Sequence, residues 1–125
     1  MIFDTDIFIW IQRGSVSAAH VLERQGERLV SVQTYLELLQ GAKNAEQQNA
    51  TRRFLKDFSV QVVPLMPEIG RQAMSLVDRY ALSHGMRAGD AIVAATALAT
   101  GQTLCTSNER HFRQIPQLDL VTIKP

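Results

Sequence analysis

Short apolar segments alternate with segments of helical periodicity along the 125 residues of this chain. We expect strands at residues 1–3, 29–32, 60–63, 102–105 and 118–123, separated by helices that include residues 17–25, 33–43, 44–58, 67–84 and 90–99. Such alternation requires crossover connections, which make neighbouring strands parallel and pack helices against the sheet. The sequence therefore predicts an α/β fold, a single-domain α/β/α sandwich over residues 1–125 with a mostly parallel central sheet.

Composition narrows the class of protein further. Hydrophobic residues make up 46% of the chain and charged residues 20%, which is typical of a globular protein and argues against a disordered or fibrous one. No apolar run reaches the ~18 residues that a membrane span needs, and the first residues do not resemble a secretory signal. The one cysteine, Cys105, excludes an internal disulfide framework and a multi-cysteine zinc site. We therefore expect an intracellular, cytoplasmic protein with no membrane partner.

Two polar clusters stand directly after predicted strands. Asp4–Asp6 follows the first strand, and Thr106–Asn108 follows the fourth strand much later in the chain. In an open parallel sheet the ligand site lies beyond the carboxyl ends of the strands, so the topology could bring these clusters into one site. We expect Asp6 to cap the helix that follows, which leaves Asp4 free to face the sheet edge.

Two further acids are candidates, although each has an ordinary structural explanation. Asp90 opens the helix predicted at residues 90–99, where capping alone explains an aspartate and is compatible with metal binding. Glu37 lies on the polar face of the helix predicted at residues 33–43, where an isolated glutamate is usually a solvated surface residue. Only the company of the other acids makes a functional role for Glu37 worth testing.

Carboxylates and an amide at a strand-end cleft would suit Mg²⁺ or Mn²⁺, which prefer oxygen ligands and keep several waters. Such an ion activates a bound water and offsets charge on a phosphoryl oxygen. No competing nucleophilic arrangement is evident, because Cys105 is expected to be buried and all histidines are expected at surface or capping positions: His20, His84 and His111. The sequence also lacks a glycine-rich phosphate loop.

Four motifs in a fixed order carry a resemblance to a known family. They are the Asp-Thr-Asp start at residues 4–6, Thr-Tyr-Leu-Glu-Leu-Leu-Gln-Gly at 34–41, Gly-Asp-Ala-Ile-Val-Ala-Ala-Thr-Ala at 89–97, and Thr-Ser-Asn-Glu-Arg-His-Phe at 106–112. Together they closely resemble the PIN domain and, within it, the VapC-like toxin ribonucleases of bacterial toxin–antitoxin pairs. The likeness covers essentially the whole chain, including residues 112–118.

The resemblance implies endoribonuclease activity that depends on Mg²⁺ or Mn²⁺, with a tRNA as one possible substrate. Asp4 and Asp90 match the principal metal-binding acids, and Glu37 matches the second acid. Asn108 falls where many relatives have a fourth acid, so it offers an amide oxygen without a charge and puts a second tightly held metal in doubt. Neighbouring positions are expected to support the site: Thr5, Asp6 and Thr106.

The resemblance also implies partners, namely an RNA substrate, a cognate antitoxin that blocks the acidic cleft, and a second copy in a homodimer. If four acids occupy the site, 13 basic and 8 acidic side chains remain elsewhere, a balance that suits a polyanion. Candidate RNA contacts, each equally explicable as a solvated surface residue, are Arg52, Arg53, Lys56, Arg110 and Arg113. The apolar run at residues 8–11 offers more surface than one helix face needs, which favours an interface.

Two other functions are compatible with parts of this sequence. A catalytically weak or inactive PIN-fold module that binds RNA or a protein is favoured only by Asn108, whereas Asp4, Glu37 and Asp90 speak against it. An aspartyl-phosphate phosphatase would also begin with an Asp-x-Asp motif. That family needs threonine or valine where this chain has Phe8, and a lysine at a strand end that this chain lacks.

Overall fold

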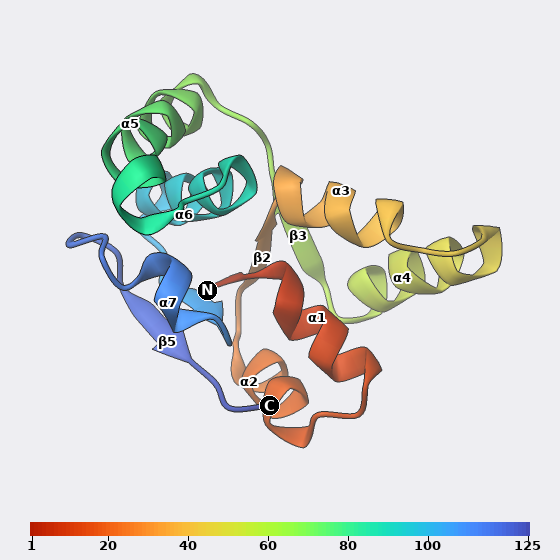
Figure 1. Cartoon of the computed structure of the whole chain (residues 1–125). Helices are drawn as coiled ribbons and strands as arrows, with labels where there is room; N and C mark the ends of the chain where they lie inside the picture. The colour runs from red at the N-terminus through yellow and green to blue at the C-terminus, as the bar shows by residue number, and fades with distance from the viewer.

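The computed structural model describes all 125 residues, which form five strands and seven helices in a layered α/β arrangement (Figure 1). The elements are, in chain order, β1 (Ile2–Phe3), α1 (Thr5–Gln12), α2 (Val16–Arg24), β2 (Arg28–Ser31), α3 (Val32–Gln40), α4 (Ala45–Asp57), β3 (Val60–Val63), α5 (Pro67–His84), α6 (Ala88–Thr100), β4 (Leu104–Thr106), α7 (Glu109–Phe112) and β5 (Leu120–Thr122).

All the strands are parallel, and their order in the sheet is β3-β2-β1-β4-β5. The short strand β1 lies at the centre, with Ile2 opposite Leu29 of β2 and Phe3 opposite Cys105 of β4. The predicted α/β class with a mostly parallel sheet is therefore confirmed. The carboxyl ends of β1 and β4 meet at one edge of the sheet, which brings the two predicted polar clusters together.

Successive residues of the central strand point to opposite faces of the sheet, so each face builds its own core. Ile2 packs in the cluster that includes Ala94 of α6 and Leu76 of α5. Phe3 packs in the other cluster, with Ile7 of α1 and Leu38 of α3. Helices α5 and α6 therefore cover one face, and α1 to α4 cover the other (Figure 1).

Most predicted elements are present, with shifts at their ends. Helix α5 runs from Pro67 to His84 and ends at Gly85, whose φ of 64° is the left-handed conformation that glycine tolerates. Strand β4 runs one residue further than expected and includes Thr106. The last predicted strand is present as β5, which lies at an edge of the sheet and is shorter than the predicted residues 118–123. No helix combines the length and apolar character needed to cross a bilayer.

Candidate active site

Asp4 lies at the junction of β1 and α1 and is fixed from several directions. Its backbone N–H donates to the carbonyl of Cys105 over 2.9 Å, which ties it to β4. Its Oδ1 accepts from the backbone N–H of Thr5 at 2.8 Å, and its Oδ2 accepts from the Thr106 hydroxyl at 2.8 Å. The side chain is buried although it is a carboxylate. The predicted meeting of the two strand-end clusters is therefore confirmed by direct contact.

The roles of Asp4 and Asp6 differ from those predicted. Asp4 is itself the N-cap of α1 while it faces the sheet edge, so the expectation that Asp6 would be the cap is wrong. Asp6 lies in the first turn of α1, and its Oδ2 accepts from both the N–H (3.0 Å) and the hydroxyl of Ser107. The indole N–H of Trp10 also donates to the Ser107 hydroxyl, at 3.2 Å. Asp6 thus ties the turn after β4 to α1.

The charges around Asp4 repel one another. The pKa of Asp4 is raised from 3.8 to about 7, first because burial penalises the charged form and second because of the Asp6 carboxylate. Hydrogen bonds from Thr106 and Thr5 lower this pKa, and Asp90 adds a smaller increase. Burial, Asp6 and Asp4 likewise raise the pKa of the Cys105 thiol to about 12, so this buried cysteine is not a nucleophile.

Asp90 approaches the site from α6. This helix begins at Ala88 with Arg87 at the capping position and no side-chain cap. The prediction that Asp90 opens the helix is therefore wrong, and the alternative that Asp90 is only a helix cap is excluded. Asp90 instead lies in the first turn, with its Oδ2 3.3 Å from Nδ1 of His111 on α7. Sequence reasoning missed this contact, since His111 was expected only at a surface or capping position.

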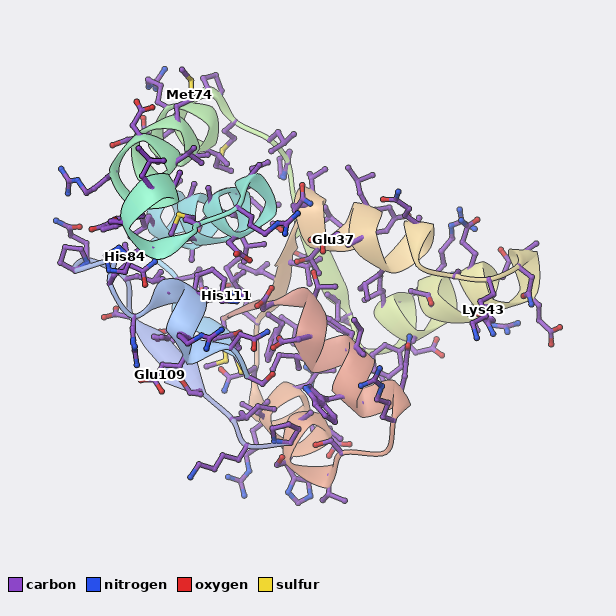
Figure 2. The ribbon with its side chains drawn as sticks, viewed as in Figure 1. Glu37, Lys43, Met74, His84, Glu109 and His111 are labelled. Atoms are coloured by element: carbon purple, nitrogen blue, oxygen red, sulfur yellow. The ribbon has the colours of Figure 1, made fainter.

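Glu37 approaches from α3 and is exposed, as its place on a polar helix face predicted. Its Oε1 accepts from Nε2 of Gln33 at 3.2 Å and from the Thr5 hydroxyl at 3.4 Å. Thr5 therefore links Glu37 to the residue next to Asp4. Glu37 and His111 lie on either side of the start of α1 in Figure 2.

The remaining predicted residues are less closely joined to the acids. Asn108 is exposed, and its backbone N–H donates to the Thr106 hydroxyl at 3.0 Å, but its side chain does not cap α7. The predicted RNA contacts are all exposed and form two groups on opposite sides of the molecule in Figure 1: Arg52, Arg53 and Lys56 on α4, and Arg110 and Arg113 on and after α7.

A pocket of about 850 Å³ lies between α1, α3 and α4, and sequence reasoning did not find it. In the apolar run at residues 8–11, which was predicted to favour an interface, Phe8 is buried whereas Ile9 is 37% exposed. Apolar side chains and both charge signs line this pocket: Phe8, Ile9, Ile11, Leu38, Phe54, Leu55, Arg13, Lys43 and Glu37. Glu37 lines this pocket and also belongs to the candidate active site, so the pocket and the site adjoin.

The donor set consists of oxygen atoms, the ligand type that Mg²⁺ and Mn²⁺ prefer. Asp6 Oδ1 is buried and has no hydrogen-bond partner, so one carboxylate oxygen beside Asp4 is free to receive a ligand. No three histidine, cysteine or acidic side chains lie close enough together to hold a metal ion on their own. A cation bound among these residues would therefore need water molecules to complete its ligands.

The fold of this chain is that of a PIN domain. The family model described as "PIN domain" matches residues 1–118, and the chain belongs to this family. Ribonuclease VapC10 of Mycobacterium tuberculosis (strain ATCC 25618 / H37Rv) is 34% identical over 122 residues, which cover 94% of this chain and 90% of that protein. Ribonuclease VapC1 of Rickettsia felis is 27% identical over 129 residues, 98% of this chain and 96% of that protein.

Solved structures agree with this assignment. A toxin–antitoxin complex from Klebsiella pneumoniae contains a chain that superposes with a TM-score of 0.80 at 29% identity, covering 97% of this chain and 95% of that one. VapBC-1 from nontypeable Haemophilus influenzae has the same fold, with a TM-score of 0.80 at 23% identity. The resemblance inferred from the four motifs is therefore confirmed at the level of family and fold.

Proposed function

We propose that this protein is a Mg²⁺- or Mn²⁺-dependent endoribonuclease that acts as the toxin of a toxin–antitoxin pair. The observation that carries the proposal is the gathering of Asp4, Asp6 and Asp90 at one sheet edge, where burial and, second, repulsion by the neighbouring carboxylates raise the pKa of Asp4 to about 7. A structural role alone gains nothing from such repulsion, whereas a bound cation would offset it. The names of relatives such as ribonuclease VapC10 supply the reaction class.

Asp4 and Asp90 would hold the metal with Glu37, directly or through water, and Asp6 Oδ1 lies among the same acids. When bound, the ion would supply an activated water and offset charge on the phosphate. Glu37, the exposed acid, would orient or deprotonate the attacking water. Thr106 would keep Asp4 in place through its 2.8 Å hydrogen bond.

RNA would reach the acids across a surface with exposed basic groups. Arg52, Arg53 and Lys56 lie on α4 at one side of the molecule. Arg110 on α7 and Arg113 after it lie at the other side, so each group would contact phosphates on a different part of the RNA strand. Asn108 would contribute an amide oxygen near Thr106 rather than a charge. With RNA as its substrate, the protein would act in the cytoplasm.

The antitoxin is the partner suggested by the toxin–antitoxin complex from Klebsiella pneumoniae. About half of the residues that line the pocket between α1, α3 and α4 are hydrophobic, and Arg13 and Lys43 also line it, so a segment with apolar side chains and an acidic residue would complement it. A partner seated there would contact Glu37 and obstruct the site. We also propose a homodimer, for which Leu82 and Met74 (labelled in Figure 2), both exposed on α5, provide apolar surface.

The test is cleavage of a mixed tRNA pool by protein freed of any co-purifying partner, with Mg²⁺, Mn²⁺ or EDTA, beside Asp90→Asn prepared identically. We expect discrete fragments with metal, and none with EDTA or the variant. Equal cleavage by Asp90→Asn would contradict the site or reveal a contaminant. Absence of both cleavage and metal binding would favour the alternative of a non-catalytic RNA-binding module.

A further inference from the structure

Gly89 stands in the first turn of α6, directly before Asp90, without the positive φ that would demand a glycine. Glycine is a poor helix former, so this position calls for another explanation. A Cβ added here would lie 3.1 Å from Nε2 of Gln33 and 3.6 Å from its Cδ, and the three nearest atoms all belong to Gln33. The missing side chain therefore makes room for the Gln33 amide of α3.

The same amide holds Glu37. Gln33 Nε2 donates to Glu37 Oε1 over 3.2 Å, across one turn of α3. The other donor is the Thr5 hydroxyl at 3.4 Å, but its single hydrogen also faces the Thr34 hydroxyl at 3.0 Å. Because Glu37 is exposed, packing does not fix its side chain. Of the two donors to Glu37, Gln33 is the closer.

We infer that Gln33 is a positioning residue for Glu37 and that Gly89 provides the space in which the Gln33 amide is held. The start of α6, which carries Asp90, thereby also determines where the Glu37 carboxylate lies. Both hydrogen bonds end on Oε1, so Oε2 is left for the attacking water. The inference rests on the proposed nuclease function, since it concerns how Glu37 is oriented for the reaction.

Gly89→Ala separates positioning from stability. Alanine favours the helix, and its Cβ meets only the end of a flexible side chain, so we expect an unchanged or higher melting temperature. The displaced Gln33 amide should slow single-turnover cleavage about three- to ten-fold, as expected for one lost hydrogen bond, at unchanged half-saturation by RNA. The matched control is Gly70→Ala on α5, where a Cβ meets nothing within 4 Å, and it should cleave at the wild-type rate.

A double-mutant cycle tests whether Gly89 acts through Gln33. Gln33→Ala should slow cleavage by a similar factor, and adding Gly89→Ala should slow it no further. The inference is overturned if the two losses multiply, or if Gly89→Ala cleaves as fast as Gly70→Ala. Wild-type protein that fails to cleave with Mg²⁺ or Mn²⁺ would overturn the proposed function as well. Cleavage that needs Glu37 but ignores Gly89 and Gln33 would overturn this inference alone.

Discussion

Asp4 and Glu37 belong to the same candidate site, yet the protein holds them in opposite ways. Asp4 is buried and is fixed by backbone groups of Cys105 on β4 and Thr5 on α1 and by the Thr106 hydroxyl. Glu37 is exposed on α3 and is held by side-chain hydrogen bonds of 3.2 Å and 3.4 Å. Burying Asp4 destabilises the protein because the acidic side chains repel one another. Leaving Glu37 exposed allows its side chain to move.

This difference separates two tasks. The buried side of the site concentrates negative charge where water cannot screen it, so it strengthens the attraction for a cation at the expense of stability. The exposed side leaves room for water and a nucleic-acid strand, so its precision depends on neighbours such as Gln33. Substitutions on the two sides should therefore differ in their effects on stability even where their effects on cleavage agree.

The largest effect is expected from neutralising each acid. Asp4→Asn and Glu37→Gln should each reduce RNA cleavage by about a hundred-fold or more, because each removes a group that acts on the transition state. In EDTA at pH 8, Asp4→Asn should raise the melting temperature, since it removes a buried repelled charge, whereas Glu37→Gln should leave it unchanged. Thermal denaturation beside a cleavage assay measures both; equal shifts in melting temperature would contradict the comparison.

The pH dependence of stability should also distinguish the buried acid. Because the folded pKa of Asp4 is raised from 3.8 to about 7, its protonated form favours the folded state. Its contribution is present below pH 3.8 and is lost as the pH rises toward about 7. The difference in melting temperature between Asp4→Asn and wild type, measured without metal, should therefore grow across this range and then level off. A constant difference would show that the Asp4 pKa is not raised.

Thr106→Val tests the support of the buried side. The substitution keeps the shape of the side chain but leaves Asp4 Oδ2 without its 2.8 Å donor and the Asn108 N–H without its acceptor. We expect a loss of about 1–3 kcal/mol in the free energy of unfolding, measured by urea denaturation. Thr122→Val is the matched control, because Thr122 is exposed on β5 in register with Thr106. Equal losses in both variants would argue against a specific role for Thr106.

The smallest effect belongs to the exposed basic groups. Arg53→Gln on α4 should weaken RNA binding a few-fold and lower the slope of log affinity against log salt by about one unit, as one lost phosphate contact predicts. Arg71→Gln is the control, since Arg71 lies on α5 and pairs with Glu68. Titration of labelled RNA into the Asp90→Asn protein at several salt concentrations would measure this without cleavage. A wild-type salt slope would exclude Arg53 from the RNA surface.

Much of this architecture could be predicted from the sequence because it depends on local pattern. Alternating apolar strands and amphipathic helices gave the parallel sheet, and the polar residues after β1 and β4 located the site. The exchange of roles between Asp4 and Asp6 was not predictable, since both are good caps and only the tertiary contact with Ser107 decides between them. The sequence predicts that a helix begins at Asp90, but α6 begins two residues earlier, at Ala88, without any side-chain cap that could mark its start.

Other features depend on contacts between distant residues, which one sequence does not reveal. The approach of His111 to Asp90 requires α7 to pack beside α6, and nothing in the spacing of these residues signals it. The pocket between α1, α3 and α4 likewise arises from how three helices diverge. Gly89 belongs to one of the four motifs, but only the nearby Gln33 amide gives a physical reason for a glycine there.

The position of β1 has a consequence for folding. This two-residue strand lies at the centre of the sheet, and its partner β4 comes from nearly the other end of the chain. Contacts so distant in sequence form slowly, because a long loop must close before they stabilise anything. During synthesis Asp4 emerges first but cannot meet Thr106 until the ribosome has made almost the entire chain. The site therefore cannot form before β4 has been synthesised, and chains that end before Thr106 lack it.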